Sequence, residues 1–127
     1  MTSGSHEFGK AAENAAEEHL CRKGYQILER NVRYPNGELD IVARDRETVV
    51  FVEVKARRSE EFGGASHAVT GQKKQKLIKL AAQYIGVHHL QDCPCRFDVV
   101  LIQGESPLSR TLDHIENAFE VTGTDSR

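Results

Sequence analysis

The sequence predicts a single α/β domain in which two helices accompany about five strands. Short β-branched and aromatic runs, of which Thr48–Val54 is the clearest, favour extended strands. Two longer stretches, 9–23 and 70–85, instead repeat their apolar residues at helical spacing. Turn signals containing glycine or asparagine separate these segments. We therefore expect one domain over residues 9–120, with flexible termini at 1–8 and 121–127.

The first predicted helix has one apolar face, and Gly24 follows it as a C-terminal cap. Ala12, Ala15 and Ala16 fall on that face. Glu13 falls where the apolar face meets the solvent face, as a side chain that points into a cleft would. The angle favours Glu13 over Glu17 for such a role, and an ordinary surface acid is the alternative for each of them.

The next three strands are predicted over 25–33, 39–43 and 48–54, with turns at 34–37 and 45–47. If the second turn is centred on residues 46 and 47, Asp40 stands opposite Glu53. Side chains alternate along a strand, so Lys55 shares a face with Glu53. The glycine-containing segment 56–68 then forms a loop beside these three residues.

Charged residues inside apolar strands are costly to bury unless they are paired or bind a metal. Asp40 and Glu53 repel each other when both are ionised, and a divalent cation reverses that effect. Mg²⁺ prefers oxygen ligands, and the backbone carbonyl of Val54 would be a further one. Lys55 could orient water or neutralise developing charge. The spacing alone leaves open whether this is a metal site or a salt-bridged hairpin on a solvated face.

The remaining segments predict one more helix and two more strands. Thr70 is the expected N-cap of the second helix, and Lys73 and Lys74 lie on its inward face, one turn before Leu77. Lys73 is the best candidate for contact with a substrate phosphate, with extension into solvent as the alternative. A buried strand follows at 96–102, an edge strand at 111–115, and residues 117–119 pack back on the core. Asp98 is expected to form a structural pair with Arg96 or with a nearby helix.

Composition excludes several classes of protein. The formal net charge of −2 is not typical of a non-specific DNA-coating protein. We expect neither a membrane span nor a signal peptide, because no apolar stretch is long enough. The three cysteines lack a disulfide pattern, which fits a reducing cytoplasm. A zinc site formed by His88, His89, Cys93 and Cys95 is disfavoured by the single residue between the thiols, so a connecting loop is expected there.

The order Asp40…Glu53-Val54-Lys55 resembles the motif of the PD-(D/E)xK nuclease superfamily, which includes restriction endonucleases and archaeal Holliday-junction resolvases. Further motifs resemble the small bacterial YraN-type family, a resolvase-like branch of that superfamily. They are Gly9-x3-Glu13, Gly24-Tyr25-x-Ile27-Leu28, Asn31-x-Arg33, Gly37-Glu38-Leu39-Asp40-Ile41, Phe51-Val52-Glu53-Val54-Lys55-x-Arg57, Ala68-Val69-Thr70-x2-Lys73 and Arg96-Phe97-Asp98-Val99-Val100. Gly71 departs from the family, which often has proline there, and this bears on the start of the helix only.

The resemblance implies a restriction-endonuclease-like core: a mixed β-sheet with helices on its faces and a site for Mg²⁺ or Mn²⁺. It implies Asp40, Glu53 and Lys55 as the central trio, with Glu13 contributed by the first helix. The expected function is metal-dependent hydrolysis of phosphodiesters in DNA rather than RNA, with branched or nicked DNA preferred to plain duplex. A homodimer would suit a four-way junction. Contacts to nucleic acid are expected from Lys73, Lys74, Arg33 and Arg57.

Two alternatives of other classes stay open. One is a nucleic-acid-binding module that keeps the nuclease fold without turnover. The other is a purely structural domain in which the three charged residues form surface ion pairs.

Overall fold

A computed structural model describes residues 3–57, 70–106 and 109–119 of the chain. Most of the predicted 56–68 loop, the predicted tail at 121–127 and motif residues 68 and 69 lie outside these ranges. The elements in chain order are α1 (Ser3–Arg22), β1 (Gln26–Tyr34), β2 (Gly37–Asp45), β3 (Thr48–Arg57), α2 (Gly71–Val87), β4 (Cys95–Ser106) and β5 (Ser109–Phe119).

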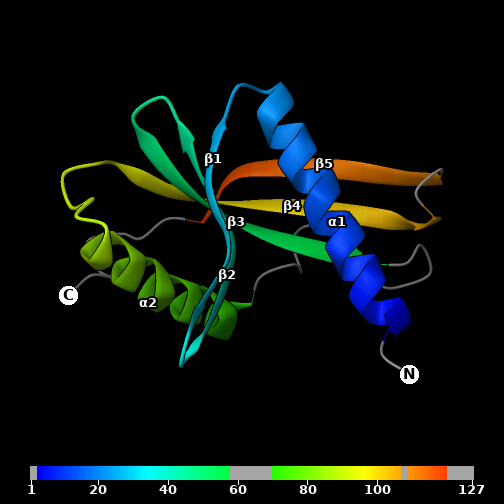
Figure 1. Ribbon diagram of the computed structural model, residues 1–127, viewed down its shortest axis with the longest axis horizontal. Coiled ribbons are helices and arrows are strands. Elements are labelled where there is room, and N and C mark those ends of the chain that lie inside the picture. The colour runs from blue at the N-terminus through cyan, green and yellow to red at the C-terminus, as the bar shows by residue number, and fades with distance from the viewer. Residues whose placement is uncertain (1–2, 58–69, 107–108, 120–127) are drawn as a thin grey trace.

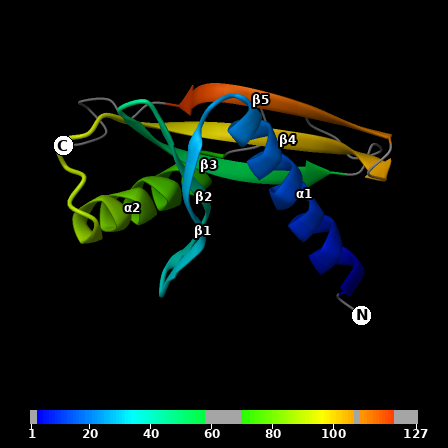
Figure 2. The ribbon, with the colours of Figure 1, turned by 45° about the horizontal axis from the view of Figure 1, so that its top comes forward.

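One mixed sheet contains all five of these strands in the order β1-β2-β3-β4-β5. β3 and β4 are parallel and α2 lies between them in the chain, whereas the other neighbouring pairs are antiparallel. The β1–β2 hairpin runs across the direction of β3, β4 and β5 (Figures 1 and 2). This arrangement of a mixed sheet between two helices agrees with the predicted α/β, restriction-endonuclease-like core.

The two faces of the sheet carry separate apolar cores. On one face, Ala12, Ala16 and Leu20 of α1 pack against alternate strand residues such as Ile41 and Val52. On the other, α2 packs against the intervening strand residues, and its buried residues are the predicted stripe of Leu77, Leu80, Ala81 and Tyr84. The sheet is therefore covered on both sides, which explains why Val49–Val54 is almost continuously apolar.

Most predicted elements are present but longer than predicted. α1 begins at Ser3, although the prediction began at residue 9, because a glycine inside a helix lowers its stability without ending it. The strands extend past their apolar runs because backbone pairing continues there, as between β4 and β5. The predicted caps of the helices are confirmed. The side chain of Thr70 accepts a hydrogen bond from the backbone N–H of Lys73 as the N-cap of α2, and Gly24 follows α1 with a φ of 93°.

The two outer strands are irregular. The pairing of β1 with β2 shifts register between Ile27 and Glu29, and Asn31 has a φ of 53°. The pairing of β5 with β4 also shifts at two places, and Asn117 near its end has a φ of 52°. Each outer strand is thus bent by a bulge or a left-handed residue.

The tip of the β1–β2 hairpin packs against α2. Gly37 opens β2 with a φ of +149°, a conformation that side chains rarely adopt. A Cβ atom there would lie 2.9 Å from Cε of Lys76 and 3.1 Å from Cδ1 of Leu80. Glycine at this position lets the hairpin tip approach the helix closely.

We expect Gly37→Ala to lower the free energy of unfolding by about 1–3 kcal/mol, because the backbone conformation becomes strained. Gly86→Ala is the control, since a Cβ at that helical glycine meets nothing within 4 Å. The control should be neutral or stabilise the protein by up to about 1 kcal/mol. Urea unfolding followed by circular dichroism measures both, and equal stabilities for the two variants would contradict the role given to Gly37.

Candidate functional site

β2 and β3 separate next to the predicted trio. Their pairing begins with Asp45 opposite Thr48 and proceeds to Ile41 opposite Val52, which is the register expected from a turn at residues 46 and 47. It ends there, one step before the predicted pairing of Asp40 with Glu53. Instead, the backbone N–H of Val54 donates to Oδ2 of Asp40 at 2.9 Å. The Asp40 carboxylate thus takes the place of a backbone acceptor where the strands part.

The sequence around Asp40 explains this separation. Ile41 belongs to the core under α1, whereas Leu39 belongs to the core under α2. The regular alternation of β2 side chains between the two faces of the sheet is therefore interrupted at Asp40. Glu53, on the neighbouring strand, is one of only two buried charged residues in the described part of the chain, with an exposed fraction of 7%. Glu53 is therefore buried, and Asp40 half-buried, where the two cores meet.

Asp40 and Glu53 line the same small internal cavity, and each affects the electrostatics of the other. The pKa of Asp40 is raised to about 7, mainly by burial and next by the negative charge of Glu53. The hydrogen bond from the N–H of Val54 opposes this rise, and the charges of Glu13 and Glu38 add to it. Three other carboxylates, from α1, β2 and β3, therefore raise the pKa of Asp40.

Lys73 of α2 forms an ion pair with Glu53 that the sequence did not predict. Its Nζ lies 3.2 Å from Oε2 of Glu53, and the exposed fraction of the Lys73 side chain is 40%. Lys73 was placed on the inward face of the first turn of the helix, and the polar group that it contacts there is Glu53. A phosphate contact by Lys73 stays a prediction.

Glu13 of α1 is held by two side chains of β1, and neither Asp40 nor Glu53 lines the pocket in which it lies. Its Oε1 accepts hydrogen bonds from Nη2 of Arg30 at 3.2 Å and from Nδ2 of Asn31 at 3.1 Å. The same amide of Asn31 donates to Oε2 of Glu38 at 3.0 Å. These residues line a pocket of about 330 Å³ together with Gly9, Lys10 and Arg33. Sequence reasoning placed Glu13 at a cleft but missed Arg30, whose role depends on how α1 lies on β1.

The other predicted residues lie around this centre. Lys55 is half-buried on β3, two residues beyond Glu53. The Nζ atom of Lys74 lies 5.5 Å from the ring centroid of Phe119. Arg33 is exposed, and its Nε lies 4.0 Å from Oε2 of Glu38. Arg57, half-buried, is the last residue of β3. Their contacts with nucleic acid stay predictions.

The residues present fit a hard divalent cation. Half-buried Asp40 and buried Glu53 bring carboxylate oxygens to the same cavity, and the charge of Glu53 contributes to the raised pKa of Asp40. Oxygen donors of this kind suit Mg²⁺ and Mn²⁺. Within residues 3–57, 70–106 and 109–119, no group of three or more His, Cys, Asp or Glu side chains is arranged to hold a metal. The fit therefore rests on two carboxylates, as Mg²⁺ sites in proteins allow.

Comparison with known proteins places the chain in a family. The model of the Uncharacterised protein family UPF0102 matches residues 12–102. The chain belongs to this family. Three UPF0102 relatives illustrate the similarity, and the alignments cover most of each chain. A protein of Pseudomonas putida is 45% identical over 88% of this chain and 92% of its own length. A relative from Trichlorobacter lovleyi is 41% identical over 93% of this chain and 94% of its own length. One from Thermodesulfovibrio yellowstonii is 45% identical over 89% of this chain and 96% of its own length.

The UPF0102 assignment confirms the predicted resemblance to YraN-type proteins. The family is uncharacterised, so membership supplies no activity. No helix in the described part of this UPF0102 chain is long and apolar enough to cross a membrane.

A network centred on Asp98, which lines the same cavity as Asp40 and Glu53, joins β4 to β5. Nε of Arg96 donates to Oδ1 of Asp98 at 3.0 Å, which confirms the predicted pair. Nε2 of His114 lies 2.8 Å from Oδ2, and the backbone N–H of Asn117 donates to Oδ1 at 2.9 Å. Burial alone raises the pKa of Asp98, but these hydrogen bonds hold it below its usual value. The contributions of His114 and Asn117 were missed because both come from the distant β5.

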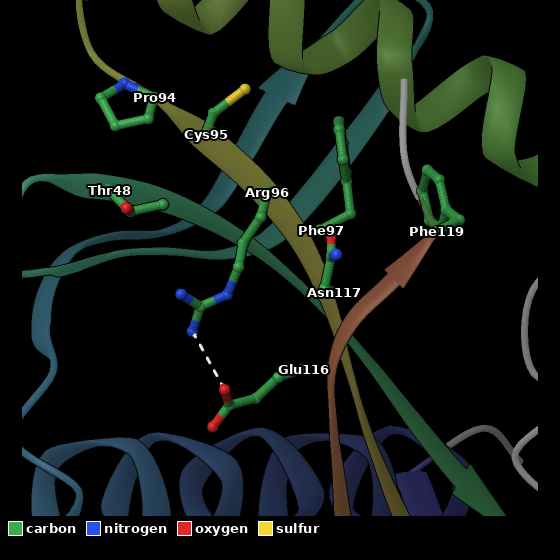
Figure 3. Close-up of a pocket in the computed structure, with 8 residues that line it drawn as sticks. All are labelled: Thr48, Pro94, Cys95, Arg96, Phe97, Glu116, Asn117 and Phe119. Carbon is green, nitrogen blue, oxygen red and sulfur yellow. Dashed lines mark ion pairs between the residues drawn. The ribbon is translucent and has the colours of Figure 1, made fainter. Parts of the chain in front are cut away.

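A second pocket, of about 510 Å³, lies where β4 begins (Figure 3). Arg96 points toward Glu116 in it, and the closest atoms, Nη2 and Oε1, are 3.9 Å apart. None of the predicted trio lines this pocket. Arg96 also donates to Asp45, Asp98 and Tyr25. Its guanidinium is thus committed to joining β4 with its neighbours.

The Cys/His segment before β4 makes packing contacts. The ring of His88 stacks on Tyr84 with centroids 4.0 Å apart. Nη2 of Arg44 lies 3.9 Å from Sγ of Cys93. These contacts agree with the connecting loop that the sequence favoured over zinc.

The raised pKa of Asp40 predicts how stability depends on pH. Folding raises this pKa from 3.8 to about 7, so the folded state binds the proton more tightly than the unfolded state. Stability is then highest below the unfolded value and falls as the pH rises through about 7. In EDTA, Asp40→Asn should be more stable than wild type near pH 8, by a few kcal/mol at most, at about 1.4 kcal/mol per pKa unit.

The advantage of Asp40→Asn should disappear near about pH 3, below the unfolded pKa of 3.8, where Asp40 is mostly protonated in both states. Asp113→Asn, at an exposed position of β5, serves as the control for loss of one negative charge. Urea unfolding at both pH values measures the difference. An Asp40→Asn protein that is no more stable than the control near pH 8 would contradict the electrostatic account.

Proposed function

We propose that this protein is a phosphodiester hydrolase that depends on Mg²⁺ or Mn²⁺ and acts on DNA. The observation that carries the proposal is the pairing of half-buried Asp40 with buried Glu53 at one internal cavity, where β2 leaves β3. A structural role would not require two like charges in one low-dielectric position, since repulsion and burial both oppose it. Strongly perturbed acids in such settings are typical of functional sites.

Asp40 and Glu53 would hold the metal, with the backbone carbonyl of Val54 as a further ligand. When bound, the cation would supply Lewis-acid polarisation of a phosphate oxygen and a lower pKa for bound water. The chain positions this donor set in advance, because the N–H of Val54 fixes the orientation of Asp40. Burial excludes competing water from Glu53, which strengthens its attraction for any cation.

Lys55 and Glu13 would act around this centre. Lys55 lies two residues beyond Glu53 on β3, and its ammonium can orient the attacking water or neutralise developing negative charge. Glu13 is held by Arg30 and Asn31 near enough to influence Asp40 electrostatically. It would assist through water at the edge of the site.

Basic residues on both sides of the site would bind the DNA backbone. Lys73 and Lys74 come from α2, Arg33 from β1 and Arg57 from β3. Backbone contacts of this kind make binding dependent on salt rather than on sequence. We infer branched or nicked DNA as substrate, a cytoplasmic location and a homodimer that matches the two-fold symmetry of a junction.

A second candidate function is nucleic-acid binding without turnover. The observation that favours it is the ion pair of Lys73 with Glu53, which neutralises the buried acid without a metal. A protein of this type would bind forks and junctions in a salt-sensitive way and would leave them intact with every divalent metal.

We expect Glu53→Ala and Lys55→Ala each to reduce cleavage of a labelled four-way junction in Mn²⁺ by at least about a hundredfold. Both variants should retain the circular dichroism spectrum of the folded domain. Glu47→Ala, at the exposed turn between β2 and β3, is the matched control and should cleave as wild type does. Forks, nicked duplexes and single strands tested in parallel identify the preferred substrate.

Full cleavage by either variant would remove that residue from the mechanism. Salt-sensitive binding by wild type with no cleavage in any metal would favour the second candidate function.

A further inference from the structure

Glu53 has a cationic partner that belongs to the protein itself. Nζ of Lys73 lies 3.2 Å from Oε2 of Glu53, and Glu53 is only 7% exposed. Leaving a buried charge without a partner is strongly unfavourable. In the structure, the lysine therefore occupies the place of a counter-ion at the carboxylate to which the proposed function assigns the metal.

A dication bound by Asp40 and Glu53 weakens the hold of Glu53 on Lys73. Two ionised carboxylates and a doubly charged cation sum to zero charge, so the net attraction that holds the ammonium at 3.2 Å is cancelled once the cation binds. Burial also strengthens the direct repulsion between the dication and the ammonium, because few water molecules screen it. Metal binding therefore favours movement of the ammonium away from Glu53.

The helix allows Lys73 to move without unfolding. Lys73 lies in the first turn of α2, where the Thr70 side chain caps its backbone N–H. Its side chain is 40% exposed, so a change of rotamer carries the ammonium toward solvent. The neighbouring Lys74 is placed differently, over the ring of Phe119. Lys73 is thus the lysine of α2 that can exchange an internal partner for an external one.

We propose that Lys73 is an exchangeable counter-ion that makes the protein bind metal and DNA together. Without metal it pairs with Glu53 and is withheld from DNA. With metal on Glu53 it is released and pairs with a phosphate of the DNA backbone. Because such linkage is reciprocal, DNA that engages Lys73 must tighten metal binding by the same factor. This inference rests on the proposed function, since it needs a metal at Glu53.

The first experiment measures metal affinity by calorimetric titration with Mn²⁺ in the absence of DNA. Lys73→Met keeps the length of the side chain and removes the competing charge, so it should bind Mn²⁺ about five- to tenfold more tightly than wild type. Lys79→Met, at an exposed lysine of the same helix, is the control and should change the affinity by less than about twofold. The melting temperature of Lys73→Met should also rise more on addition of Mn²⁺ than that of wild type.

The second experiment requires no metal. In EDTA, Glu53→Gln removes the charge that retains Lys73, so this variant should bind a labelled four-way junction about five- to tenfold more tightly than wild type. In the Lys73→Met background the same Glu53→Gln substitution should give less than about a twofold gain. This double-mutant cycle separates the release of Lys73 from the simple loss of one negative charge. Glu47→Gln controls for the latter.

The third measurement tests the linkage itself. Ca²⁺ replaces Mg²⁺, and the integrity of the DNA is checked after each titration. Ca²⁺ should tighten binding of the junction by wild type, and most of this gain should be absent from Lys73→Met but present in Lys79→Met.

Two results would overturn the inference alone: Lys73→Met binding Mn²⁺ no more tightly than wild type, or additive effects in the double-mutant cycle. Failure of the proposed function gives a different signature. In that case wild type shows no heat with Mn²⁺, and Glu53→Gln leaves the titration unchanged.

Discussion

The hydrogen bond from the Val54 N–H to the Asp40 carboxylate is the interaction on which the candidate site depends. It forms where β2 stops pairing with β3, so a side chain satisfies a backbone donor that the sheet leaves behind. The same contact fixes an acid beside Glu53, in spite of their repulsion. The Asp40 carboxylate thus satisfies a backbone donor of the fold and also adds a second negative charge next to Glu53.

The site also depends on the sheet being covered on both faces. α1 contributes Glu13 from one side, and α2 contributes Lys73 from the other. The side chains of β2 switch from one core to the other at Asp40, so the two acids lie where the cores meet. Neither helix alone could supply both Glu13 and Lys73, because each helix approaches only one face of the sheet.

The sequence predicted what depends on neighbours along the chain. The turn at residues 46 and 47 set the register of β2 and β3, Thr70 marked the start of α2, and Asp98 paired with Arg96 two residues away. Contacts between distant elements were not predictable in this way. The Lys73–Glu53 ion pair, the hold of Arg30 on Glu13 and the position of His114 beside Asp98 all require knowing how helices and edge strands dock on the sheet. The end of the β2–β3 pairing at Ile41 was missed for the same reason, because it follows from the twist of β2 between the two cores.

The irregular outer strands limit how this protein can assemble. An edge strand that is straight and regular offers unpaired backbone groups to a strand of another molecule. Here both edges are interrupted, β1 by its register shift and Asn31, and β5 by its register shifts and Asn117. Charged side chains such as Arg33 and Glu116 project from the same strands. Sheet extension from one subunit into the next is therefore disfavoured, and copies of this chain that associate would have to meet through helices, turns or side-chain surfaces, while the backbone edges stay protected from aggregation.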